Sequence, residues 1–213
     1  MQPRPPRSLA RLTPFPIMST TRVPSEESQL AILDSDASLH DKALACHRLV
    51  YVAGPESVPA LAALLDDDVL SDYARSGLEA IEDAAASQAL IDALPKLTGR
   101  LLAGVVNSLG VRREKTAVAT LQKLAADTAS GVQAEALASL GLIATPAASD
   151  TLREVMSKGA DDLKTAAGHA SLVAIEHLRR DGDSGTASEL LKSLTAAFPE
   201  GPIHDASKAL TNS

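Results

Sequence analysis

The stretch GVQAEALASLGLIATPAASDTLREVM, residues 131–156, decides the fold. Apolar residues recur in it at spacings of three and four on both sides of Ala144-Thr145-Pro146, which is the pattern of two amphipathic helices joined by a tight turn. Pro146 suits the start of the second helix, because the first turn of a helix does not need the missing N–H. One such pair cannot bury its own apolar face, so it predicts neighbours of the same kind.

The same pattern recurs along the chain. A first series of leucines is separated by 29, 31, 31 and 32 residues, and a second series by 29, 31, 31 and 39: Leu49, Leu78, Leu109, Leu140 and Leu172; Leu61, Leu90, Leu121, Leu152 and Leu191. We therefore expect five helical pairs, each with a first helix, a turn and a second helix. The longer last separation places an insertion at 179–185, which has the composition of a loop. A column of small residues, Gly77, Ser108, Ser139 and Ser171, predicts close approach of neighbouring first helices.

Composition agrees with an all-α fold. Alanine (38) and leucine (31) dominate the 213 residues, whereas aromatic residues make up 2% and tryptophan is absent. Strands use β-branched and aromatic side chains on their faces, so a β-sandwich or barrel is excluded.

A helical pair that repeats about every 31 residues, with leucine columns and a central turn, resembles the short HEAT repeats of bacterial proteins of the phycobilisome-lyase-like type. Residues 131–156 carry the best match, residues 100–125 the next, and the resemblance covers roughly 40–197. It implies a right-handed α-solenoid of about five HEAT-like hairpins. The main departure is Arg112, which stands in a column otherwise held by Val52, Ile81, Ile143 and Ile175.

The ends of the chain differ from the repeats. Residues 1–28 are rich in Pro and Arg, and we predict that they are disordered, with the repeat domain over 29–213. Met18 opens an ordinary start sequence, so the residues before it are either a leader or an extension from a misassigned start codon. At the other end we predict a capping helix over 203–210, with Ala206, Ala209 and Leu210 packed inward and Asp205, Ser207 and Lys208 in water.

Charge and cysteine content limit the function classes. The net charge is -7, although residues 1–25 carry four arginines and no acid, so the repeats are clearly acidic and a nucleic-acid partner is disfavoured. One cysteine cannot form an internal disulfide, and no apolar run reaches the length of a membrane span. We expect a cytoplasmic protein that is monomeric and does not bind a membrane.

The sequence also contains no convincing catalytic or metal-binding pattern, and we expect no cofactor. His169 and His177 are two helical turns apart, too far to share one ion. Cys46 lies among core positions, although its column (Cys46, Arg75, Val106, Leu137, His169) mixes polar and apolar residues and predicts partial exposure. The acidic run 66–68 lacks the spacing of a calcium loop and is interpreted as a solvated turn.

Five basic residues are the candidate partner contacts: Arg75, Arg112, Arg113, Lys123 and Arg153. For Arg112 the alternatives are that the helix ends before it, that it pairs with a carboxylate such as Glu79, Glu82 or Asp83, or that it is a solvated charge at a helix C-terminus.

The second helices face inward in HEAT solenoids, and here they carry a mixture of acidic, basic and apolar residues, which suits a protein surface. We therefore expect a non-enzymatic scaffold that binds another protein through its concave helical surface. The alternative is an accessory lyase-like protein that handles a chromophore or other small ligand on the same scaffold.

Overall fold

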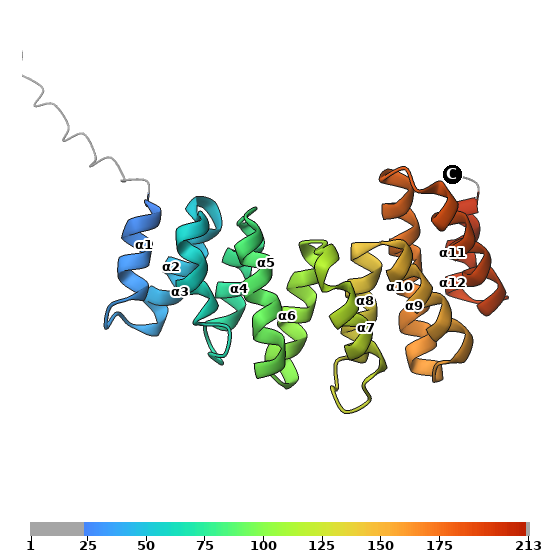
Figure 1. Ribbon diagram of the computed structural model, residues 1–213, viewed down its shortest axis with the longest axis horizontal. Coiled ribbons are helices and arrows are strands. Elements are labelled where there is room, and N and C mark those ends of the chain that lie inside the picture. The colour runs from blue at the N-terminus through green and yellow to red at the C-terminus, as the bar shows by residue number, and fades with distance from the viewer. Residues whose placement is uncertain (1–23, 212–213) are drawn as a thin grey trace, which may run out of the picture.

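The computed structural model describes residues 24–211, and within them the regular elements are all helical. Ten α-helices form five stacked pairs, which we number as repeats 1 to 5 from the N-terminus; Figure 1 shows the pairs side by side along the long axis. The first helices are α2 (Leu39–Val52), α4 (Ser71–Ala80), α6 (Gly99–Val111), α8 (Gln133–Ile143) and α10 (Asp161–Arg180). The second helices are α3 (Val58–Ala62), α5 (Ala84–Ala93), α7 (Val118–Ala126), α9 (Pro146–Lys158) and α11 (Ser184–Ala197).

Three short 3-10 helices adjoin the second helices. They are η1 (Pro55–Ser57) before α3, η2 (Leu94–Lys96) after α5 and η3 (Lys115–Ala117) before α7. The predicted α-solenoid of five hairpins is confirmed, and so is the turn at Ala144-Thr145-Pro146. In repeats 1 to 4 both leucine columns are buried in one continuous apolar core that runs from Cys46 to Ile203, whereas Leu172 and Leu191 of repeat 5 are partly buried and pack against it.

First helices of successive repeats approach closely, as the small-residue column predicts. Ser108, Ser139 and Ser171 are buried, and the Ser139 hydroxyl donates to the Val106 carbonyl on the preceding first helix at 2.9 Å. A Cβ atom added to Gly141 would lie 2.5 Å from the Ala170 carbonyl oxygen, so α8 and α10 meet backbone to backbone there. This contact leaves no room for a side chain at position 141.

The array begins with a helix whose first three residues, 26–28, fall in the segment predicted to be disordered. Helix α1 (Glu26–Leu33) starts three residues before the predicted domain boundary at 28/29, whereas the rest of the predicted segment, residues 1–23, lies outside the described residues. Leu30 and Leu33 precede Leu61 and Leu64 by 31 residues, one repeat length, and α1 accordingly occupies the place of a second helix before repeat 1. Glu26 fixes it, because its carboxylate accepts hydrogen bonds from the Gly54 N–H (2.7 Å) and the Ser57 hydroxyl (2.6 Å).

Repeat 5 corrects the prediction of a loop at 179–185. Helix α10 continues through Arg180, so only residues 181–183 separate it from α11. The inserted residues lengthen the helix, because 179–180 continue its hydrogen-bonded ladder and basic side chains suit a helix C-terminus.

A last helix, α12 (Pro202–Thr211), packs on α10 and α11. The predicted capping helix is confirmed, but its inward face is wrong in part: Ile203 and Ser207 are buried, Leu210 is half-buried and Ala209 is exposed. Ser207 can be buried because its hydroxyl donates to the His204 carbonyl at 2.7 Å, which satisfies its hydrogen bond locally.

Candidate interaction surface

The exposed side of the second helices forms one surface along the array, which we call the second-helix surface. One equivalent position in each repeat lies on it: Ala63, Asp92, Lys123 and Glu154, which are exposed, and Ser193, which is half-buried. Because the helices are parallel copies of one unit, these positions form a row and the surface is continuous in space, although its residues come from distant parts of the sequence.

Open grooves lie between neighbouring second helices. The groove between α1 and α3, counting η1 with α3, is lined by Glu26, Glu27, Leu30, Ala31, Asp34, Glu56, Pro59 and Ala60. The groove between α3 and α5, counting η2 with α5, is lined by Ala62, Ala63, Leu65, Asp66, Ala89, Asp92, Ala93, Lys96 and Leu97.

Two more grooves follow toward the C-terminus. Between α5 and α7 the walls are Ile91, Leu94, Pro95, Thr120, Lys123, Leu124 and Asp127. Between α9 and α11 they are Arg153, Met156, Ser157, Ser193, Ala196 and Ala197. Between α7 and α9 the Gln122 side chain reaches across, donating to the Thr151 hydroxyl (2.8 Å) and the Ala147 carbonyl (3.1 Å).

Lys123 and Arg153 are the two predicted contact residues that lie on this surface. Lys123 is exposed and lines the groove between α5 and α7. Arg153 lies on α9, where it pairs with Asp150 on its own helix and with Glu189 on α11, Nη1 to Oε2 3.3 Å. The structure therefore brings these two side chains to one face, although 30 residues separate them.

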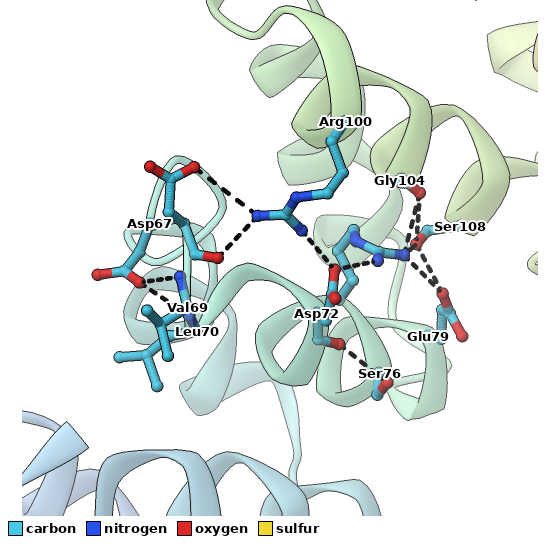
Figure 2. A network of polar contacts seen from close by, with 11 residues as sticks. Asp67, Val69, Leu70, Asp72, Ser76, Glu79, Arg100, Gly104 and Ser108 are labelled. Carbon is cyan, nitrogen blue, oxygen red and sulfur yellow. Dashed lines mark hydrogen bonds and ion pairs between the residues drawn. The ribbon is translucent and has the colours of Figure 1, made fainter. Parts of the chain in front are cut away.

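Arg75 instead contacts the next repeat. Its Nη1 donates to the Gly104 carbonyl and the Ser108 hydroxyl on α6, each at 3.1 Å, and its Nη2 pairs with Asp72 at 2.6 Å. The Ser108 hydroxyl donates in turn to Glu79 on α4 at 2.6 Å. Figure 2 shows this network, which joins repeats 2 and 3.

The network extends to the acidic run at the start of repeat 2. Arg100 on α6 pairs with Asp72 (3.3 Å) and donates to the Asp68 carbonyl (2.7 Å), as Figure 2 shows. Asp67 accepts hydrogen bonds from the N–H groups of Val69 and Leu70, which hold the pKa of its carboxyl below the usual range. The run 66–68 is thus bonded at Asp67 and Asp68, rather than simply solvated as its composition suggested.

Arg112 stands in an otherwise apolar column, and its guanidinium forms hydrogen bonds with the C-terminal end of α4. Helix α6 ends at Val111, and the Arg112 guanidinium donates to the carbonyls of Leu78 (2.6 Å) and Ile81 (2.5 Å) at the C-terminus of α4. Its Nε also donates to the Ser87 hydroxyl at 2.9 Å. These carbonyls have no intrahelical partner, so a cation from the next repeat satisfies them. Of the three alternatives, the end of the helix before Arg112 is confirmed, and the acceptors of its guanidinium are mainly carbonyls rather than carboxylates.

Arg113 points the other way along the array. It adopts a left-handed backbone conformation with φ of 51°, which ends α6 and directs the side chain toward the following repeats. Its Nε donates to the Leu142 carbonyl on α8 at 3.0 Å, and its Nη2 pairs with Asp181 at 2.5 Å. Arg75, Arg112 and Arg113 therefore connect repeats, and partner binding through them stays a prediction.

The structure corrects the expected partial exposure of Cys46. The column of Cys46 faces the first helix of the next repeat, because Arg75 in the same column donates a hydrogen bond to the Gly104 carbonyl on α6. Cys46, Val106 and Leu137 of this column are buried. His169, the member of this column in repeat 5, is exposed. Burial raises the pKa of the Cys46 thiol to about 11, so the thiolate is scarce at neutral pH.

Within residues 24–211, no three His, Cys, Asp or Glu side chains gather closely enough to hold a metal ion. Over the same residues, no helix combines the length and apolar character needed to cross a bilayer.

Comparison with known proteins supports the fold. Residues 87–171, from α5 into α10, match the family of HEAT repeats. Together with the stacked helical pairs, this match supports a HEAT-repeat protein, a class of helical scaffold that typically serves protein interaction. No curated protein matches the chain in sequence.

Proposed function

We propose that the protein is a non-enzymatic scaffold that binds another protein through its second-helix surface. The observation that supports this most is the set of four open grooves between second helices, each lined by apolar side chains together with charged ones. Grooves of this kind accept side chains of a partner, while their charged residues select among partners.

The rigidity of the array suits such a role. Bonds between repeats, from Arg75, Arg112 and Arg113, hold neighbouring first helices in a fixed relation. A surface that is ordered before binding loses less conformational entropy when a partner docks. The alternative, a lyase-like role with a chromophore, stays a prediction, as does the finer resemblance to bacterial proteins of that type.

Affinity capture from the native lysate, followed by titration of each purified captured protein, tests the proposal. The variant Ala63→Arg/Lys123→Glu changes two exposed groove residues, and Ala138→Arg changes an exposed residue on first helix α8 as a control. We expect a partner whose affinity falls in the groove variant and is retained in the control. Binding that survives the groove variant, or is lost only in the control, would contradict the proposal.

The chromophore alternative has its own experiment. The protein is incubated with a bilin, and absorbance and the mass of covalent adducts are recorded. A shifted absorbance band or an adduct would favour the alternative over a protein-binding scaffold.

A further inference from the structure

The N-terminal half of the second-helix surface carries a concentrated negative charge. Its two grooves, α1 to α3 and α3 to α5, have six carboxylates among their lining residues, whereas Lys96 is the single base there: Glu26, Glu27, Asp34, Glu56, Asp66 and Asp92. We call this pair of grooves the acidic half.

The grooves of the C-terminal half lack this excess of carboxylates among their lining residues. The groove between α5 and α7 has one base, Lys123, and one acid, Asp127. The groove between α9 and α11 has Arg153 and no acid among its lining residues. Arg153 is itself paired with Asp150 and Glu189. Among the groove-lining residues, an excess of carboxylates is therefore found in the acidic half and not in these two grooves.

Several carboxylates of the acidic half are available to a ligand. Glu26 is engaged by Gly54 and Ser57, and Asp92 accepts a hydrogen bond from Gln88 at 2.8 Å. Glu27, Glu56 and Asp66 are exposed, and no basic side chain of residues 24–211 forms an ion pair with them.

The acidic half is also lined by apolar side chains, among them several alanines. Leu30 and Pro59 line the first groove, Leu65 and Leu97 line the second, and alanines are among the lining residues of both. Small side chains allow the backbone of a bound segment to approach closely, and the leucines offer contacts for apolar side chains of that segment. A ligand that fits both features alternates basic and apolar residues.

We propose that the acidic half binds a Lys- and Arg-rich segment of a partner protein, whose apolar side chains contact the groove leucines and whose basic side chains pair with the groove carboxylates. This inference rests on the proposed function, whose partner class it narrows. Charge complementarity would speed the encounter and exclude acidic segments.

Fluorescence anisotropy with the full chain tests this assignment. The probe is a fluorescein-labelled synthetic peptide in which Arg alternates with Leu and Ala. The four-acid groove variant combines four substitutions of exposed acids: Glu27→Gln, Glu56→Gln, Asp66→Asn and Asp92→Asn. The matched control makes the same change in net charge at four exposed acids outside both grooves: Glu82→Gln, Glu135→Gln, Asp162→Asn and Glu200→Gln.

We expect the four-acid groove variant to bind the probe about tenfold more weakly. The loss of four exposed ion pairs of ordinary strength accounts for a change of this size. The control variant should stay within about twofold of the wild type, and added salt should weaken wild-type binding by screening. Absence of probe binding, or equal weakening in both variants, would overturn the inference. Equal binding of a peptide with Glu in place of Arg would do the same.

A further arm distinguishes this chain from a partner as the source of the basic segment. Arg4, Arg7, Arg11 and Arg22 are replaced with Gln in the full chain. Tighter probe binding by that variant would show that the chain's own arginines compete for the grooves, and would overturn the assignment to a partner.

The proposed function has a separate outcome. A captured partner that is lost in Ala63→Arg/Lys123→Glu but retained in the four-acid groove variant would leave the scaffold role standing and refute the acidic half as its binding site.

Discussion

Arg113 and Asp181 form an ion pair, Nη2 to Oδ2 2.5 Å, that links repeat 3 to repeat 5 across repeat 4. The same guanidinium also donates a hydrogen bond to the Leu142 carbonyl on α8, which belongs to repeat 4. In a solenoid each repeat normally contacts only its neighbours, so this pair is an exception. It is possible because α10 is longer than the other first helices and brings its C-terminal turn back toward α6.

We expect Arg113→Ala to lower the unfolding midpoint in urea more than Asp181→Ala does. The arginine change removes the bond to Leu142 as well as the ion pair, whereas the aspartate change removes only the ion pair. The double variant should resemble Arg113→Ala alone, since the pair is already broken in it. Additive effects of the two changes would show that the residues do not interact in solution.

Arg112→Met should cost about 1–3 kcal/mol of unfolding free energy, because it keeps the apolar stem but leaves the Leu78 and Ile81 carbonyls without their donor. Arg100→Met is the control: Arg100 is 54% exposed, and exposed ion pairs contribute little. Urea titration of both variants measures the difference. A cost for Arg112→Met no larger than for the control would contradict the capping role.

The roles of these arginines mark the limit of prediction from sequence. Helical pairs and turns were predictable, because each repeat displays the same leucine spacing and turn residues. Arg112 stood out as a charge in an apolar column, yet its acceptors are backbone carbonyls on another helix, and carbonyls have no sequence signature. Arg113 finds Asp181, 68 positions away, only through the lengthened α10. The grooves result from the stacking of neighbouring second helices. The sequence predicted that these helices form a binding surface, but it did not predict which residues line the grooves.

Helix α1 is an instance where a signal was present. Leu30 and Leu33 precede Leu61 and Leu64 by one repeat length, so the repeat could have been extended by one helix toward the N-terminus. The first residues of α1 were predicted to be disordered because they directly follow a stretch rich in Pro and Arg. Partial exposure of Cys46 was predicted because its column also contains polar residues. Of these, His169 belongs to the last repeat and is exposed, whereas Cys46 belongs to an earlier repeat and is buried.

Gly141→Ala should destabilise the protein by about 1–3 kcal/mol, although alanine is normally the better helix former. The new Cβ would lie 2.5 Å from the Ala170 carbonyl oxygen, and a backbone atom cannot move aside as a flexible side chain can. Gly185→Ala in α11 is the control, since its Cβ would meet only the Asp183 side chain at 3.7 Å. Thermal melts of the two variants should shift in opposite directions or differ clearly. Equal shifts would mean that α8 and α10 are less closely packed.

His177 should make stability fall on mild acidification. Burial, followed by the charges of Arg113 and Arg180, lowers the pKa of this half-buried imidazole below its ordinary value of 6.5. The unfolded chain therefore binds the proton first, so stability is complete above about pH 6.5 and declines as pH falls toward the folded pKa. Urea unfolding at pH 7.5 and pH 5.5 should show a smaller loss in His177→Gln than in the wild type. An equal loss in both would assign the pH dependence to other groups.

Helix α12 should protect the end of the array. Ile203 is buried, and a Cβ atom on Gly168 of α10 would meet both Ile203 and Phe198, so the three residues form the closing contact of the core. Ile203→Ala should lower the unfolding free energy by about 2 kcal/mol, as expected for a large apolar side chain removed from a core margin. Lys208→Ala, a change at an exposed position of the same helix, should have little effect. Deletion of residues 202–213 should lower the melting temperature further and cause self-association, because the apolar face of α10 and α11 would then be open to water. A truncated chain that melts and sediments like the full chain would show that repeat 5 needs no cover, and that α12 only rests on it.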